Sequence, residues 1–471
     1  MKWNKSFRLV FLWIVFVTVL IGIRFKSYFF VPIPLWYDWG MYRDFMFASF
    51  NFLPHIRLDG FAPWIQQIYE PWLWLLTNIP LLFWYSVDRI LLWWFWLLSI
   101  ITSFFIYLAL KKYGKYAGYL WMLLFWISII QYQTFWRGYL KQIIGIILML
   151  SIFSLFDRKK YRLSLPLLIM LIVINRPGGI FFLAVFGVWQ LISWVRTKTI
   201  DTKSISVIVW WLLLAFPIYY SVFHLQVMAM LPPLFSSIFI ESTSWTFFSL
   251  HGFIGYDIFF LLLSLRGVAL EIKKKNRDWM FVWWIVWFSR FFLWLFFYSR
   301  VAIYRDIFII LLAARGLSDL YKQRKALFLW IFRPFLILQS VWYLFYVNAM
   351  SFPLIGQVEL VNIQKIGNTI PSKSILMVTN KKYSAFVQGW TNNALIAPWL
   401  FDLDKRNQVQ WDDRHQWDWA KKCSMMQDYK NLQQSIYLRI GKNQPVENFV
   451  GQNCFDVIEN EWTSLLLKWT P

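Results

Sequence analysis

Long apolar runs recur along the first ~350 residues, and short polar stretches separate them. In the runs at 9–23 and 90–110 the only polar side chains are isolated Ser and Thr. A helix needs about 20 mostly apolar residues to cross a bilayer. The pattern therefore predicts a polytopic α-helical membrane protein.

Composition supports this class. The chain of 471 residues is 59% hydrophobic and 15% charged, whereas soluble chains average about 45–50% and about 25%. A single core cannot bury this excess, because cores stop growing near ~250–300 residues. Ordinary soluble, disordered and small disulfide-rich classes are therefore excluded.

The net charge of +23 reports mainly on topology. Basic residues gather between the apolar runs, and such clusters mark cytoplasmic loops. This rule predicts about eleven transmembrane helices, a cytoplasmic N-terminus, an extracytoplasmic C-terminus and no nucleic-acid partner. The basic clusters lie at 2–8, 111–115, 158–162, 196–203, 273–277 and 315–325.

Each pair of clusters encloses two predicted crossings and an outer loop. The segment 71–85 is too short to span and is expected to lie in the outer interface. The last helix is expected at 326–347. The paired crossings are 117–133 with 141–156, 163–174 with 179–195, 205–223 with 254–265, and 279–298 with 303–314.

The composition changes after residue 348. Residues 349–471 hold 13 Lys and Arg against 11 Asp and Glu, so 1–348 carry nearly all of the net charge. We expect a transmembrane domain at 1–348 and a soluble extracytoplasmic domain of α/β or α+β class at 349–471. The only two cysteines, Cys423 and Cys454, could form a disulfide there or remain unpaired thiols.

The predicted first outer loop, residues 25–89, is rich in carboxylates. Carboxylates at a membrane surface are candidates for proton abstraction or cation binding. They could equally be solvated loop residues or partners of Arg43 and Arg57. Four of its carboxylates precede the segment 71–85, namely Asp38, Asp44, Asp59 and Glu70.

Two motifs in this loop resemble those of the GT-C membrane glycosyltransferases. Asp38 and Tyr42 resemble the family's D-x-x-x-Y element. The run Tyr69-Glu70-Pro71-Trp72-Leu73 is similar to the Y-P-P-L of polyprenol-phosphate-mannose-dependent mannosyltransferases and the Y-E-K-P-P-L of aminoarabinose-transferase-like bacterial enzymes. The resemblance extends along the hydropathy plan to about residue 350 and includes the C-terminal domain.

The resemblance implies a cell-membrane enzyme that moves mannose, or a similar hexose or pentose, from a polyprenyl-phosphate carrier to a lipid, glycan or protein acceptor. It implies that Asp38 acts on the acceptor or holds a metal, with Glu70 as the second carboxylate. Tyr42, Asp44 and Tyr69 are then expected at the substrate. Residues 134–141 contain no Asp or Glu that could serve as metal ligands, so the binding of a divalent metal stays open. No cofactor is otherwise implied.

Basic residues on the predicted outer side are not explained by the positive-inside rule. They are candidates to bind the lipid phosphate, because Arg and Lys hold phosphate well. The alternative for each is snorkelling or an ion pair, above all for Arg305 beside Asp306. The candidates are Arg137, Lys141, Arg176, Arg300 and Arg305.

Three arguments add detail to these candidates. Arg137 and Lys141 share one face if their stretch is helical, because they are spaced i, i+4. Arg176 before Pro177 resembles the Lys-Pro of many mannosyltransferases. Glu241, in the predicted outer loop 224–253, could be a further acid, base or metal ligand, or a surface residue of an acceptor loop.

Two other functions stay open. A transporter or flippase of lipid-linked sugar would place ionisable residues inside its helices, and the predicted helices hold Arg290 and Arg333 but no acidic residue at mid-helix. A polysaccharide polymerase or ligase would use a lipid-linked oligosaccharide as donor. The sequence contains no nucleotide-binding signature.

Overall fold

The structure is a computed structural model in which the chain forms two compact units. The helical unit comprises Met1–Lys26 and Phe95–Ser351, and the mixed unit comprises Ser27–Trp94 and Phe352–Pro471. The described residues are 18–19, 21–26, 39–40, 42–43, 46, 86–110, 115–217, 250–273, 282, 298–350, 353–371, 374–378, 381–391, 393–396, 435–441, 454–460 and 464–469.

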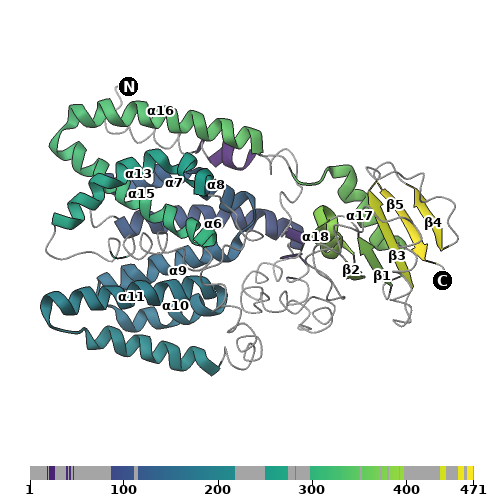
Figure 1. Cartoon of the computed structure of the whole chain (residues 1–471), viewed down its shortest axis with the longest axis horizontal. Helices are drawn as coiled ribbons and strands as arrows, with labels where there is room; N and C mark the ends of the chain where they lie inside the picture. The colour runs from purple at the N-terminus through teal and green to yellow at the C-terminus, as the bar shows by residue number, and fades with distance from the viewer. Residues whose placement is uncertain are drawn as a thin grey trace, which may run out of the picture. The chain divides into compact units, whose positions relative to one another are not determined.

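Helices make up the described part of the helical unit (Figure 1). α6 begins in the mixed unit and ends in the helical one. α13 packs along α15, and α9, α10 and α11 pack against one another. The helices are α6 Val87–Leu110, α7 Lys115–Trp126, α8 Ile129–Trp136, α9 Leu140–Asp157, α10 Tyr161–Ile174, α11 Arg176–Thr197, a helix at Thr202–Pro217, α13 Leu250–Lys273, α15 Tyr298–Gln323 and α16 Lys325–Met350.

Two described helices, at Leu140–Asp157 and Lys325–Ala349, are long and apolar enough to cross a membrane. α16 also exposes large apolar side chains, with Trp330 79% and Phe345 67% exposed. Contiguous apolar surface of this kind is unfavourable in water and suits a lipid environment. α9 and α16 lie where the sequence predicts the crossings 141–156 and 326–347.

The predicted crossing 117–133 is not one helix. α7 ends at Trp126 and α8 begins at Ile129, with Ser128 between them. The Ser128 hydroxyl accepts a hydrogen bond from the Gln131 backbone N–H at 3.1 Å, which is the bond of a helix N-cap. The uniform hydropathy of the segment hid this break.

The turn expected at residues 299–300 is also wrong. α15 begins at Tyr298 and continues to Gln323, so Ser299 and Arg300 belong to its first turn. Arg315, assigned to a cytoplasmic cluster, is buried and forms an ion pair with Glu271 of α13. The attraction within a buried ion pair offsets part of the cost of desolvating its charges, so Arg315 can lie inside the helix and a count of charges misplaced the end of α15.

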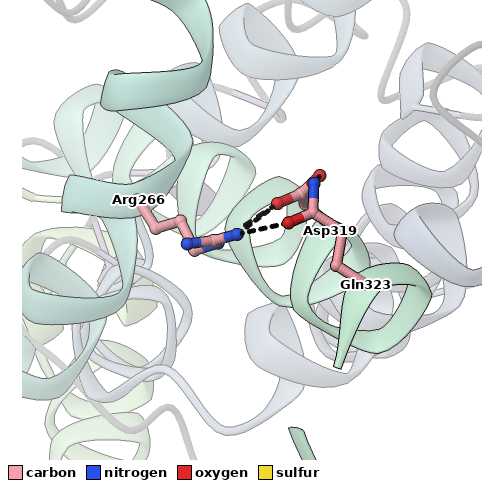
Figure 2. Close-up of polar contacts among 3 residues, drawn as sticks. All are labelled: Arg266, Asp319 and Gln323. Carbon is pink, nitrogen blue, oxygen red and sulfur yellow. Dashed lines mark hydrogen bonds and ion pairs between the residues drawn. The ribbon is translucent and has the colours of Figure 1, made fainter. Parts of the chain in front are cut away.

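α13 and α15 pack very closely. A Cβ on Gly267 would overlap the Leu312 backbone, and a Cβ on Gly316 would press on the Gly267 backbone. Beside this contact, Arg266 donates to the Asp319 carboxylate at 2.7 Å, and Gln323 joins both groups, as Figure 2 shows. Small residues and cross-helix polar bonds are typical of packing between membrane helices.

The mixed unit contains one five-stranded sheet of order β2-β1-β3-β5-β4. β1 pairs in parallel with β2 and β3, whereas β5 is antiparallel to β3 and β4. α18 packs on β1 and β2 and against α17. The elements are α17 Gln357–Thr369, β1 Ile375–Val378, α18 Lys381–Trp390, β2 Ala394–Ile396, β3 Ile436–Gly441, β4 Phe455–Asn460 and β5 Ser464–Trp469.

The mixed unit buries a polar cluster. Arg439 of β3 is 2% exposed, and its guanidinium lies 4.6 Å from the centre of the Tyr383 ring. Burial lowers the pKa of Arg439 to about 10. Burial and the hydrogen bond that its hydroxyl donates to Glu359 raise the pKa of Tyr383 to about 12. Both groups therefore keep their neutral-pH protonation states.

One cysteine of the mixed unit is described. Cys454 is disulfide-bonded, and Cys423 lies outside the described residues. The extracytoplasmic location of residues 349–471, and the domain boundary at 348, stay predictions.

Candidate functional site

Most of the predicted carboxylate site lies outside the described part of the chain. Tyr42 is described, in the mixed unit, and its side chain is 4% exposed. The residues outside the described ranges are Asp38, Asp44, Tyr69, Glu70 and Glu241. Their roles stay predictions.

Three segments of the helical unit meet at Asn175. The Asn175 side-chain amide donates to the Lys141 backbone carbonyl at 3.0 Å and to the Tyr304 hydroxyl. Its carbonyl oxygen accepts from the Gly178 backbone N–H at 3.1 Å. We call Lys141, Asn175, Gly178 and Tyr304 the Asn175 junction.

The local sequence explains why Asn175 occupies this place. It is the N-cap of α11, and Pro177 stands in the first helical turn, where proline is favoured because no N–H is needed. On α9, Gly145 leaves room for the amide, since a Cβ there would overlap the Asn175 side chain. The buried Asn175 (2% exposed) thus joins the starts of α9 and α11 to α15.

The junction gathers the segments that carry three predicted phosphate-binding residues. Lys141 belongs to the junction, Arg176 is the first residue of α11, and Arg305 follows Tyr304 and is 6% exposed. Arg300 lies in the first turn of α15. Lys141 and Tyr304 are more than a hundred positions apart in the sequence, and both form a hydrogen bond with Asn175.

The shared helical face expected for Arg137 and Lys141 is wrong. α8 ends at Trp136, Arg137 is its C-cap, and α9 begins at Leu140. Gly138 adopts a φ of 73°, a left-handed conformation that glycine readily supplies. The i, i+4 argument fails because a turn separates the two residues.

A second buried cluster lies beside Tyr304. Asp306 is fully buried and accepts hydrogen bonds from Ser128 Oγ at 2.7 Å and Gln131 Nε2 at 2.8 Å. Arg24, 1% exposed, donates to the Gln131 backbone carbonyl and interacts electrostatically with Asp306. We call Arg24, Ser128, Gln131 and Asp306 the Asp306 network.

Three aromatic rings surround Arg24 of the Asp306 network. The Arg24 guanidinium lies 5.1–5.7 Å from the ring centres of Phe125, Trp126 and Phe135. A cation gains from aromatic faces at such distances, most when it is desolvated. This environment explains how a charge directly after an apolar run is accommodated inside the bundle.

Sequence reasoning missed both Asn175 and the Asp306 network. The expectation that no acidic residue lies at mid-helix is wrong for Asp306, which is fully buried within α15. One available signal was Ser128-x-x-Gln131, which has the spacing of a capping box. Another was the run Asn175-Arg176-Pro177-Gly178, which is typical of a helix start.

We expect Asn175→Ala to lower the free energy of unfolding by ~2–3 kcal/mol, because it removes an N-cap and two hydrogen bonds across the bundle. The measurement is thermal unfolding of the purified protein in detergent. Asn348→Ala is the matched control, since Asn348 is exposed and accepts one bond from Lys26. Equal stability losses in the two variants would contradict the role given to Asn175.

The described residues include no group of three or more His, Cys, Asp or Glu that could hold a metal. The carboxylates proposed from the sequence as metal ligands lie outside these residues. Metal binding therefore stays open.

Comparisons with known proteins give a fold. No protein-family model and no curated protein matches the sequence. Among solved structures, the archaeal oligosaccharyltransferase AglB from Archaeoglobus fulgidus, in complex with an inhibitory peptide and a dolichol-phosphate, has a TM-score of 0.67 at 11% identity. That match covers 93% of this chain and 70% of AglB.

Two further structures agree. ArnT from Cupriavidus metallidurans in the apo state has a TM-score of 0.60 at 11% identity, over 99% of this chain and 98% of ArnT. An Archaeoglobus fulgidus oligosaccharyltransferase with Zn and sulfate has a TM-score of 0.61 at 11% identity, over 89% and 67%. The fold predicted from the sequence is therefore confirmed, because the chain has the fold of these GT-C glycosyltransferases.

Proposed function

We propose that this protein is a glycosyltransferase that moves a sugar from a polyprenyl-phosphate carrier to an acceptor on the extracytoplasmic face of the membrane. The observation that carries the proposal is the likeness to ArnT over nearly the whole of both chains. Because this likeness is at 11% identity, the sequence motifs of residues 38–42 and 69–73 supply the chemistry.

The proposed reaction inverts the anomeric centre. The acceptor hydroxyl oxygen attacks the anomeric carbon, and the bond from that carbon to the phosphate oxygen breaks. The electron pair of this bond leaves with the polyprenyl phosphate, while Asp38 takes the hydroxyl proton. A carboxylate within hydrogen-bond reach is a competent base for this transfer.

The other predicted carboxylates and tyrosines have supporting roles in the proposal. Glu70 is the second carboxylate, and Tyr42, Asp44 and Tyr69 contact the substrate. Glu241 is a further substrate contact. A divalent metal on these carboxylates would add a positive charge at the donor phosphate, and one neighbouring structure contains Zn.

The leaving phosphate needs its charge held rather than a proton. We assign this to Arg137, Lys141, Arg176, Arg300 and Arg305. The Asn175 junction supports the assignment for Lys141, Arg176 and Arg305, because it brings their segments together. The first turn of α11 adds a helix N-terminus, which favours anions.

A second candidate is transfer of an oligosaccharide from a lipid carrier, as a polymerase or ligase would perform it. The likeness to an oligosaccharyltransferase whose complex contains dolichol-phosphate favours it. It uses the same groups and differs in the donor.

The test uses the purified full-length protein in liposomes with radiolabelled polyprenyl-phosphate monosaccharides and a cell-envelope extract as acceptor. We expect label in the acceptor fraction together with released polyprenyl phosphate. Label transferred only from a lipid-linked oligosaccharide would select the second candidate. Movement of the intact donor across the bilayer without transfer would indicate a flippase and overturn the proposal.

A further inference from the structure

We propose that Arg43 is a positioning residue that fixes the predicted first outer loop to α18, and that the C-terminal domain thereby positions Asp38 for transfer. The inference rests on the proposed function, and it assigns a role to the domain at 349–471. All the contacts that carry it lie within the mixed unit.

Arg43 joins three elements that are far apart in the sequence. Its Nε donates to Asp88 Oδ1 at 2.8 Å, at the start of α6. Its Nη1 donates to the Gly389 backbone carbonyl near the end of α18. The guanidinium also lies 5.0 Å from the centre of the Trp390 ring. Only the planar fork of arginine can satisfy a carboxylate, a carbonyl and an aromatic face together.

The main chains meet beside this contact. A Cβ on Gly389 would overlap the carbonyl and Cα of Gly40, so the contact requires glycine at 389. Close backbone approach leaves little freedom for the segment to shift along α18. Arg43 and Gly389 thus fix the same short segment at two points.

The segment itself is buried. Trp39 and Met46 are fully buried, and Tyr42 is 4% exposed. Trp39 is bonded directly to Asp38 in the chain, so an anchor at 39–43 limits where the Asp38 main chain can lie. A general base misplaced by about 1 Å can cost ~10²-fold in rate.

We call Arg43 with its partners Asp88, Gly389 and Trp390 the clamp. Loss of the clamp is expected to slow the chemical step of the transfer. In Arg43→Ala we expect kcat for transfer from a radiolabelled polyprenyl-phosphate monosaccharide to fall about 10²-fold, with the donor KM changed less than about threefold. Arg43→Lys should recover little activity, because a point charge cannot reach all three partners. A purely structural role would lower the yield of folded protein and leave the kcat of the folded fraction unchanged.

The matched controls lie in the same unit. Arg89→Ala removes an exposed arginine next to Asp88, and Gly356→Ala adds a Cβ where the nearest atom is 3.8 Å away. Both should keep wild-type kcat. Gly389→Ala should behave like Arg43→Ala, because its Cβ forces the two main chains apart.

Hydrogen exchange of the full-length protein provides a readout that does not need catalysis. In Arg43→Ala and Gly389→Ala, peptides covering 37–46 should exchange at least ~10-fold faster, while peptides covering β1 and β3 keep their protection. Unchanged exchange at 37–46 would overturn the clamp. Faster exchange with wild-type kcat would overturn the positioning role. If the wild type transfers no sugar and the exchange still changes as expected, the proposed function fails and the clamp stands.

Discussion

Asp38→Asn is expected to lower sugar transfer by ~10²–10⁴-fold while leaving insertion and folding intact, because the amide cannot accept the acceptor proton. The side chain keeps its size, so the loss reports on proton transfer rather than on packing. The measurement is the rate of a single turnover at a saturating concentration of polyprenyl-phosphate monosaccharide. Under these conditions neither donor binding nor product release contributes to the measured rate.

Asp59→Asn is the control for Asp38→Asn. It makes the same isosteric change in the same predicted loop, outside the two motifs, and should retain transfer within about threefold, because the proposed reaction gives Asp59 no role. Wild-type turnover in the Asp38→Asn variant would show that this residue is not the base.

Asp306→Ala is expected to lower the free energy of unfolding by ~3–5 kcal/mol, the usual cost of leaving a buried charge without its partner. Asp306 is fully buried and accepts bonds from Ser128 and Gln131, and it interacts electrostatically with the buried Arg24. The measurement is thermal unfolding in detergent, with ligand-free protein.

Two variants make the Asp306 measurement decisive. Asp319→Ala removes a carboxylate of the same helix whose partner Arg266 has a side chain 40% exposed, so it should cost ~1 kcal/mol or less. The double variant Arg24→Met/Asp306→Ala should be more stable than Asp306→Ala, since no unpaired charge remains. If Asp306→Ala cost no more than Asp319→Ala, the network would not stabilise the bundle.

Hydropathy located three helices well, although it missed the break between α7 and α8. The crossings predicted at 141–156, 163–174 and 326–347 correspond to α9, α10 and α16 within a few residues. It failed where charges are paired inside the bundle. Residues 299–300 were expected to form a turn and Arg315 to lie in a cytoplasmic cluster, yet all three belong to α15.

The sequence indicated the charged residues of the candidate site but not the neutral residue that joins their segments. Their charge on the predicted outer side singled out Arg137, Lys141, Arg176, Arg300 and Arg305 as candidates, and their roles stay predictions. The role of Asn175 was not proposed, because its sequence context indicates only a helix start and does not identify the distant partners of its amide. Lys141 and Tyr304 become those partners only when α9 and α15 pack around the start of α11.

The sequence by itself predicted a polytopic membrane protein whose first predicted loop carries motifs that resemble those of the GT-C glycosyltransferases. Long apolar runs and short motifs are local properties, and the cost of placing apolar surface in water leaves few alternatives. The tertiary structure decided which charges are buried partners, as for Arg24 with Asp306, and which distant segments meet, as for Arg43 with Gly389. Arg43 and Gly389 are hundreds of positions apart in the sequence, and only the packing of helices and strands brings them within hydrogen-bond distance.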